Sequence, residues 1–260
     1  MYNFDTICGL SFNKKTMKTL ILIPSRLSAT RLPGKPLLKI NGISIISHVF
    51  KKALDTNIGE VFVAAEDQDI IDDVKKNGGQ AILTNSHHKT GTDRIHEALK
   101  KLGKSDIELV INLQGDEPLI NIEDIRKLHN QMIITKSELG TLAANIKNKN
   151  LYDEQNVVKV ETEENLENTR FPKAINFMRK STVKTQNIYH HLGIYCYQVE
   201  TLKSFVSLDQ SQNEIKYKLE QLRALDNDIN INVSLASNAS IGIDTNEDFM
   251  AIKKIMEYKS

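Results

Sequence analysis

Residues Thr19–Pro24 (TLILIP) form a short and nearly continuous apolar run, which is the clearest indication of the fold in the sequence. Such a run is typical of a parallel strand that helices cover on both faces. After this run, strand-like segments alternate with segments that carry apolar residues at helical spacing. The expected strands cover residues 60–65, 81–84, 108–113 and 139–146, and the expected helices cover 43–54, 68–76, 92–102 and 122–134.

This alternation predicts an α/β protein with a mostly parallel, three-layer sheet and right-handed crossovers. On such a sheet, ligands bind outside the C-terminal ends of the strands, near the point where the strand order reverses. We therefore expect the binding site in the loops that follow Pro24, Ala65, Thr84 and Leu113.

The alternation stops near residue 148. The next strand-like segments cover residues 156–161, 174–178 and 190–198, with no helical pattern between them, which predicts an antiparallel insertion. A helix at 213–225, a strand at 230–235 and a closing helix after Thr245 complete the pattern. We interpret residues 1–17 as an N-terminal extension and residues 18–260 as one domain with an antiparallel elaboration around 150–200.

Composition excludes several classes of protein. The 260 residues include 34 Lys+Arg and 33 Asp+Glu, and this balance argues against a protein that coats nucleic acid. The two cysteines, Cys8 and Cys196, are too few for a disulfide framework and fit a reducing compartment. No apolar run approaches the roughly 20 residues that cross a bilayer, and the first residues make a poor signal peptide. We expect a soluble, cytoplasmic protein without a nucleic-acid or membrane partner.

The loop after the first strand, residues 24–36 (PSRLSATRLPGKP), is the most informative segment for function. It carries three cations, Arg26, Arg31 and Lys35, and Gly34 lets the backbone approach a ligand closely. Arginine forks match phosphate geometry, and lysine adds a compact charge. The loop is neither a Walker A motif nor a GxGxxG turn. A solvated basic loop would explain any one of these cations, but the three together favour an anion site.

Two aspartates are candidate metal ligands. Asp116 lies in residues 114–118 (QGDEP), directly after the expected strand 108–113, where a carboxylate is well placed to hold Mg²⁺. The same residues are also good turn formers. Asp244 lies in residues 241–248 (IGIDTNED), where capping of the last helix is the competing explanation.

Asp67 and Asp69 match the DxD pattern with which glycosyltransferases bind a metal. They also open an expected helix, where acidic residues favour the helix dipole. We consider this second explanation the stronger one.

The remaining candidates have simple structural explanations. His190 and His191 are adjacent in a strand, so their side chains point to opposite faces. Tyr195 and Tyr197 share one face, which most often reflects packing, and Cys196 is more typical of a small buried hydrophobe than of a nucleophile. For Glu220 and Gln221, on the expected helix 213–225, a surface position is the default.

Together these segments resemble the 3-deoxy-manno-octulosonate cytidylyltransferase (CMP-KDO synthetase) family. Each string alone is weakly specific, but the ordered set is strongly specific and spans residues 18 to the C-terminus. The matching segments are Ser25–Arg26, Thr30–Leu37 (TRLPGKPL), Gly91–Arg94 (GTDR), Asn112–Pro118 (NLQGDEP), Asn156–Val160 (NVVKV), His191–Tyr195 (HLGIY), Leu219–Arg223 (LEQLR) and Gly242–Thr245 (GIDT).

The resemblance implies a nucleotidyltransferase-like, Rossmann-like fold and the transfer of CMP from CTP to the anomeric hydroxyl of KDO, an acidic sugar of lipopolysaccharide. It also implies a homodimer and Mg²⁺ bound by Asp116 and Asp244. Arg26, Arg31 and Lys35 would hold the triphosphate, and Thr92 and Arg94 would lie near the cytidine. Catalytic roles fall to Arg26, Lys35, Asp116 and Asp244, and the sugar pocket to Gln114, Arg179, His191, Tyr195, Glu220 and Gln221.

The chain departs from the family pattern at two places. Residues 177–183 (FMRKSTV) replace a segment in which Ser-Arg is followed by an Ile-Pro-Trp-like run, and the chain contains no tryptophan. Ala65-Glu66-Asp67 replaces Ala-Thr-Asp. A related acceptor such as 8-amino-KDO therefore stays open, as do a glycosyltransferase that uses Asp67 and Asp69 and a non-catalytic nucleotide-binding protein.

Overall fold

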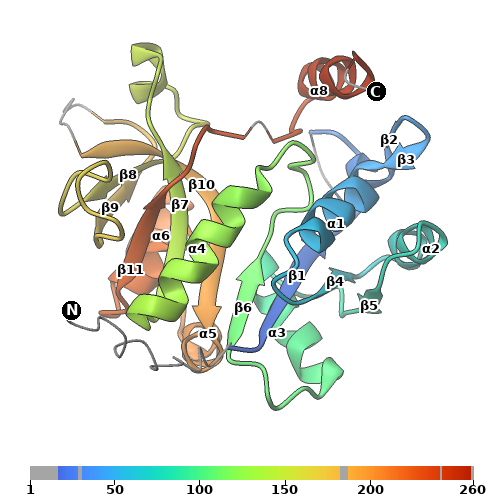
Figure 1. Cartoon of the computed structure of the whole chain (residues 1–260), viewed down its shortest axis with the longest axis horizontal. Coiled ribbons are helices and arrows are strands. Elements are labelled where there is room, and N and C mark those ends of the chain that lie inside the picture. The colour runs from blue at the N-terminus through green and yellow to red at the C-terminus, as the bar shows by residue number, and fades with distance from the viewer. Residues whose placement is uncertain (1–16, 29–30, 182–186, 241, 259–260) are drawn as a thin grey trace, which may run out of the picture.

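The computed structural model describes residues 17–28, 31–181, 187–240 and 242–258. Within these residues, nine strands form one sheet with helices on both of its faces (Figure 1). The strands are β1 (Thr19–Ser25), β4 (Glu60–Ala65), β5 (Ala81–Leu83), β6 (Leu109–Asn112), β7 (Leu139–Ala144), β8 (Lys159–Thr162), β9 (Ala174–Met178), β10 (Ile188–Gln198) and β11 (Ile231–Leu235). The helices are α1 (Ile45–Asp55), α2 (Gln68–Lys76), α3 (Gly91–Leu102), α4 (Ile122–Thr135), α5 (Val199–Ser207), α6 (Gln212–Tyr217), α7 (Leu222–Leu225) and α8 (Asn246–Tyr258).

The strand order is β11-β7-β10-β6-β1-β4-β5, with β8 and β9 attached beside β10. β1 pairs in parallel with both β4 and β6, and β7 pairs in parallel with β11. The chain runs from β1 outward to β4 and β5 and then returns to β6 on the other side of β1. The strand order therefore reverses at β1, and a ligand crevice is expected between the C-terminal ends of β1 and β6.

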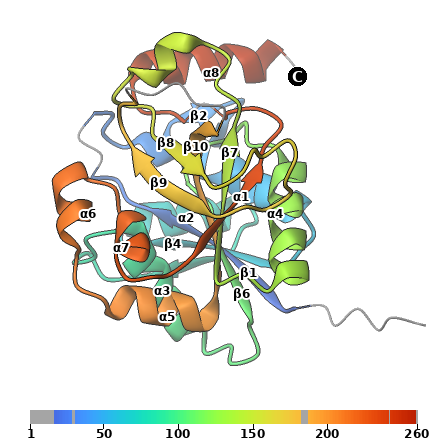
Figure 2. The ribbon, with the colours of Figure 1, turned by 90° about the vertical axis from the view of Figure 1, so that its left-hand side faces the viewer.

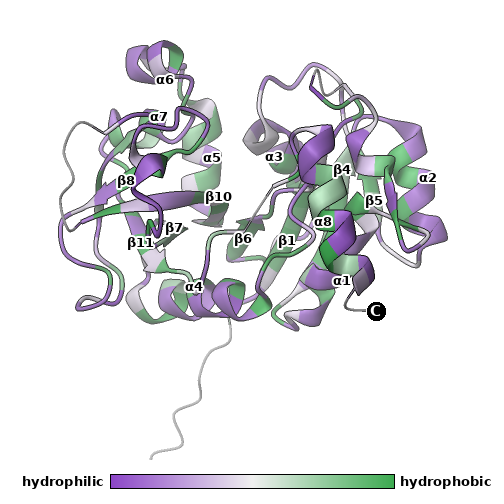
Figure 3. Cartoon of the chain, turned by 90° about the horizontal axis from the view of Figure 1, so that it is seen from above, coloured by the Kyte–Doolittle hydropathy of each residue, from purple (hydrophilic) through white to green (hydrophobic). Residues whose placement is uncertain are grey.

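Alternating side chains of β1 build the two halves of the core. Ile21 and Ile23 belong to the cluster that packs against α1, α2 and α4, whereas Leu20 and Leu22 belong to the cluster on the α3 and α5 side. All four side chains are fully buried, and each such burial stabilises the fold by about 1.5–3 kcal/mol. Figure 2 shows α4 and the group α5 to α7 on opposite sides of the sheet. Seen from above, hydrophobic residues concentrate on the central strands (Figure 3).

The predicted α/β fold class is confirmed, and the antiparallel insertion needs one correction. β8 and β9 form an antiparallel hairpin on β10, as expected of an insertion. However, β10 is no peripheral strand, because it lies between β6 and β7 and pairs antiparallel with both. Most of its side chains are buried, so it serves as a central strand of the main sheet.

Three local predictions also differ from the structure. The helix expected at 213–225 is split into α6 and α7, because Lys218 adopts a left-handed backbone (φ 54°) and ends α6. The strand expected from residue 156 begins at Lys159. Ile43 and Ser44 form a short strand, β3 (Ile43–Ser44), paired with β2 (Lys39–Ile40), and the Ser44 side chain then caps α1.

The N-terminal extension is described only at Met17, since residues 1–16 lie outside the described residues.

Among the described residues, no helix has the length and apolar character that crossing a bilayer requires.

Candidate functional site

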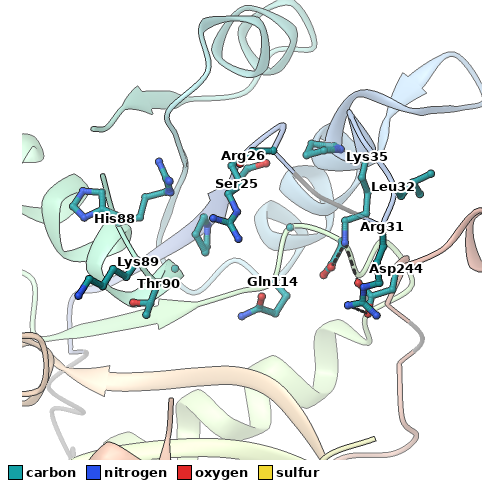
Figure 4. Close-up of a pocket in the computed structure, with 17 residues that line it drawn as sticks. Ser25, Arg26, Arg31, Leu32, Lys35, His88, Lys89, Thr90, Gln114 and Asp244 are labelled. Carbon is teal, nitrogen blue, oxygen red and sulfur yellow. Dashed lines mark hydrogen bonds and ion pairs between the residues drawn. The ribbon is translucent and has the colours of Figure 1, made fainter. Parts of the chain in front are cut away.

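A cavity of about 380 Å³ opens at the C-terminal ends of β1 and β6, where the strand order reverses. Figure 4 shows His88, Lys89 and Thr90 at one end, Arg31, Lys35 and Asp244 at the other, and Arg26 and Gln114 between them. The lining residues are Pro24, Ser25, Arg26, Ser28, Arg31, Leu32, Lys35, Pro36, His88, Lys89, Thr90, Gly91, Arg94, Gln114, Gly115, Asp116 and Asp244.

Two carboxylates from distant parts of the chain meet at one lysine. The Lys35 Nζ atom lies 2.6 Å from Asp116 Oδ2 and 3.3 Å from Asp244 Oδ1. Arg31 Nη2 lies 3.0 Å from Asp244 Oδ2. The backbone N–H of Ile243 donates to the Asp116 carbonyl at 3.0 Å, which joins the two loops. Two of the three predicted triphosphate cations, Arg31 and Lys35, thus form one cluster with the predicted metal carboxylates.

Glycines allow this cluster to form. Gly34 has φ 69° and precedes the short 3₁₀ helix Lys35–Leu37, so the chain turns sharply where Lys35 begins. A Cβ atom on Gly115 would lie 3.1 Å from the Pro24 carbonyl oxygen. Glycine therefore lets the Asp116 loop pack directly against the end of β1.

The donor set of the cluster fits a magnesium ion that shares its ligands with a phosphate. Mg²⁺ is usually held by one or two carboxylates together with substrate phosphates and waters. Asp116 and Asp244 supply the carboxylates, and the neighbouring cations would attract phosphate. Among the described residues no group of three or more His, Cys, Asp or Glu side chains is arranged to hold a metal. A bound ion at Asp116 and Asp244 would therefore need ligand oxygens as well.

Arg26 and Lys89 line the cavity without making a hydrogen bond or an ion pair in the part of the chain that the structure describes. They are therefore available to an anionic ligand. Sequence reasoning singled out Arg26 but missed Lys89. The signal was present, because Lys89 lies in the loop after Thr84, which was expected at the site.

A clasp on α3 holds the loop that carries Lys89. The Glu97 carboxylate accepts the backbone N–H of Asn85 at 2.9 Å, contacts His88 Nε2 and pairs with Lys101 at 2.7 Å. Burial alone would raise the pKa of Glu97, but these partners outweigh it and lower the pKa to about 2. Sequence reasoning did not identify this clasp, because its members are far apart in the chain.

The two residues expected near the cytidine behave differently. Arg94 is buried and lines the cavity, with Nη1 donating to Thr84 Oγ1 at 2.8 Å and Nη2 paired with the Glu66 carboxylate. Thr92 is buried and lies outside the set of described residues that line the cavity. Thr90, the N-cap of α3, takes the position at the cavity wall.

Gln114 lines the cavity, whereas His191 and Tyr195 do not belong to the described lining. His191 is buried between Phe177 and Tyr195, and its Nε2 lies 3.0 Å from Thr141 Oγ1. Burial lowers the pKa of His191 to about 3 and raises that of Tyr195 well above its usual value. Both side chains are therefore neutral at physiological pH.

The other predicted sugar-pocket residues also lie outside the described lining. The Arg179 guanidinium donates to three carbonyls, those of Tyr217 (3.0 Å), Gln155 (3.2 Å) and Lys218 (3.0 Å). Gln221 is buried, and Glu220 lies in the turn between α6 and α7. Burial raises the pKa of Glu220, so the expectation of a surface carboxylate on a helix is wrong.

The structure supports neither a metal-binding role for the DxD pattern nor a nucleophilic role for Cys196. Asp67 Oδ2 accepts the backbone N–H of Leu27 at 2.8 Å, and Asp69 lies in the first turn of α2. Both fall outside the described lining of the cavity. Cys196 is buried in the core, where burial raises the pKa of its thiol.

A cation-rich cavity with paired carboxylates, at the switch point of a mostly parallel sheet, defines a nucleotidyltransferase-type protein. Residues 20–231 match the cytidylyltransferase family. The 3-deoxy-manno-octulosonate cytidylyltransferase of Rhodopseudomonas palustris (strain HaA2) is 41% identical over 92% of this chain and 98% of that protein. The Thermodesulfovibrio yellowstonii protein of the same name is 43% identical over the same shares of the two chains. The chain belongs to the 3-deoxy-manno-octulosonate cytidylyltransferase family.

Solved structures agree with this placement. The structure of CMP:2-keto-3-deoxy-manno-octonic acid synthetase complexed with CTP superposes with a TM-score of 0.84 and 33% identity. It covers 94% of this chain and 100% of that one. A 4-diphosphocytidyl-2C-methyl-D-erythritol synthase from Anaerococcus prevotii shares the fold alone, with a TM-score of 0.63 at 15% identity.

Proposed function

We propose that this enzyme transfers CMP from CTP to the anomeric hydroxyl of KDO and releases pyrophosphate. The observation that carries the proposal is the Lys35, Asp116 and Asp244 cluster, which shares one cavity with Arg26 and Lys89, two cations that have no partner among the described residues. A nucleoside triphosphate has the charge that this arrangement would bind. The high similarity to a CMP-KDO synthetase complexed with CTP supports cytidine as the nucleoside.

In the proposed reaction, the anomeric oxygen attacks the α-phosphorus and its proton leaves to solvent or a base. The bond from that phosphorus to the pyrophosphate oxygen then breaks. Catalysis of this kind depends on positioning and on charge neutralisation, and it needs no covalent enzyme intermediate. Arg26, Arg31, Lys35 and Lys89 would bind the triphosphate, and Arg94 would lie at the base.

Asp116 and Asp244 would hold Mg²⁺, since they are the two carboxylates in the described lining of the cavity. When bound, such an ion neutralises triphosphate charge and lowers the pKa of the attacking hydroxyl.

The acceptor would bind beside Gln114, on the side of the cavity that faces β10. Gln114 lines the cavity and donates to the Gly193 carbonyl at 2.9 Å, so it joins the nucleotide cavity to the strand that carries His191 and Tyr195. His191, Tyr195, Glu220, Gln221 and Arg179 are proposed to shape the acceptor side.

Two further properties are proposed for the assembled enzyme. The exposed apolar side chains of Ile175 on β9 and of Ile215 and Tyr217 on α6 support a homodimer interface in this region. Light scattering on the purified protein would then give twice the mass of one chain.

We place the enzyme in the cytoplasm, where CTP is available, at the step that activates KDO for lipopolysaccharide synthesis.

Pyrophosphate release from CTP and Mg²⁺, with and without KDO, tests the function. Release that requires KDO establishes both the reaction and the acceptor. Turnover with 8-amino-KDO and none with KDO would move the proposal to the related acceptor. CTP binding without turnover on any acidic sugar would contradict catalysis and favour a nucleotide-binding role.

A further inference from the structure

Glu66 is a carboxylate at the binding edge of the sheet that the proposed function leaves without a role. It directly follows β4, and its carboxylate forms an ion pair with Arg94 Nη2 on the first turn of α3. The Arg94 side chain is 3% exposed and that of Glu66 13%. A buried guanidinium needs a partner charge, because an unpaired one is costly to remove from water. Glu66 supplies this charge.

Arg94 is held on two sides. Its Nη1 donates to Thr84 Oγ1 at 2.8 Å and to the Asn85 carbonyl at 3.3 Å, while Glu66 holds Nη2. Within the described chain, its Nε–H and the second N–H of Nη2 have no other acceptor. The guanidinium is thus fixed in orientation, lines the cavity and keeps donors for a ligand.

The two ends of the cavity differ in how their charges are paired. At one end Lys35 and Arg31 pair with Asp116 and Asp244, which are carboxylates suited to a metal and a triphosphate. At the other end the charge of Arg94 is cancelled by Glu66 alone. The fixed Arg94 guanidinium offers directed hydrogen-bond donors to the cavity, which suits the acceptor edge of a heterocycle.

We propose that Glu66 is a positioning residue for recognition of the base, acting through Arg94; the inference rests on the proposed cytidylyl transfer. A guanidinium has donors only. Cytosine presents neighbouring acceptors at O2 and N3, whereas uracil presents an N–H donor at N3. A guanidinium fixed against the base edge favours cytosine, but one that is free to turn away discriminates less. A threonine, which the family pattern has at this position, could not cancel the charge of Arg94.

Calorimetric titration with CTP and with UTP, in the absence of any acceptor, tests the proposal. Glu66→Gln keeps a hydrogen-bond acceptor but loses the charge, and Glu66→Thr loses both. We expect Glu66→Thr to weaken CTP binding by about tenfold and Glu66→Gln by less, because charge-assisted hydrogen bonds are the stronger ones. The preference for CTP over UTP should fall in the same order.

Two controls separate positioning from a general structural effect. Glu60→Gln removes a carboxylate at the opposite end of the same strand, where Glu60 pairs with Lys104, and should leave CTP binding unchanged. In an Arg94→Met background, Glu66→Gln should cause no further loss of CTP affinity, because Glu66 acts through Arg94. Additive losses, or an unchanged CTP/UTP preference in both Glu66 variants, would overturn the inference. Failure of the unmodified enzyme to bind CTP would instead overturn the proposed function.

Discussion

The nucleotide side and the acceptor side of this molecule use their polar residues in opposite ways. On the nucleotide side, the loops after β1, β5 and β6 place Arg26, Lys89 and the Lys35 cluster at a cavity wall. On the acceptor side, His191 and Tyr195 pack against each other in a row of aromatic rings on β10. All three guanidinium nitrogens of Arg179 donate hydrogen bonds to backbone carbonyls.

The difference follows from where the residues lie in the fold. Loop residues can present charge to a ligand without supporting the core, whereas residues on a central strand are fixed by packing on both faces. We therefore expect substitutions of the charged loop residues at the nucleotide cavity to lower activity and spare stability. Substitutions of residues that pack beneath these loops or on the acceptor side should lower stability as well. Four experiments test this contrast.

The largest effect is expected at the carboxylate cluster. Asp116→Asn or Asp244→Asn keeps the size of the side chain but removes the charge that would hold Mg²⁺. We expect kcat for pyrophosphate release to fall by about 10³-fold or more, because charge neutralisation in the transition state is lost. The midpoint of thermal unfolding should stay within about 2 °C, since Asp116 and Asp244 are partly exposed loop residues outside the core. A large drop in that midpoint would contradict the expectation that substitutions at the nucleotide cavity spare stability.

The next effect is expected in the aromatic row. Tyr195→Ala removes a buried ring that packs on His191 and Tyr197, and should lower the free energy of unfolding by about 3–5 kcal/mol in a urea titration. His191→Ala should lower it less and should raise KM for KDO more than KM for CTP. Equal changes in the two KM values would remove His191 from the acceptor side. Unchanged stability in Tyr195→Ala would show that this row is less tightly packed than its burial indicates.

A smaller effect, on pH dependence, is expected at the clasp of Glu97. The pKa of Glu97 is lowered to about 2 in the folded protein from an ordinary value of 4.5. Its charge therefore stabilises the fold above about pH 4.5, and this stabilisation is lost as the pH falls towards 2. Glu97→Gln should lower the free energy of unfolding by about 2–3 kcal/mol at pH 6. The difference from the unmodified protein should narrow at pH 3. A difference that is the same at both pH values would exclude the charge as its cause.

The smallest effect is expected at Lys89, which is exposed and unpaired among the described residues. Lys89→Ala should raise KM for CTP by about three- to fivefold at low salt, with a smaller effect in 0.5 M NaCl, because salt screens an exposed charge. Lys75→Ala, on the last turn of α2 and outside the described cavity lining, is the matched control and should change nothing. A salt-independent effect of Lys89→Ala would point to packing and not to charge.

The sequence alone determined the order of the elements in the first half and the place of the nucleotide site. Apolar runs such as Thr19–Pro24 and the helical spacing in 68–76 depend on local periodicity, which the sequence displays directly. The loops after Pro24, Ala65, Thr84 and Leu113 were expected at the site because every parallel strand of one sheet ends at the same edge. Residues of the loops after Pro24, Thr84 and Leu113 line the cavity, whereas the described lining includes none from the loop directly after Ala65. The ordered family motifs, such as 112–118, identified the family.

Only the tertiary structure decided which of these residues meet and which charges remain available. No local pattern shows that Lys35 lies between Asp116 and Asp244, that Glu66 neutralises Arg94, or that β10 enters the sheet between β6 and β7. Each of these facts joins segments that are far apart in the chain. Their geometry is set by how the helices and strands pack and by the cost of leaving a buried charge without a partner.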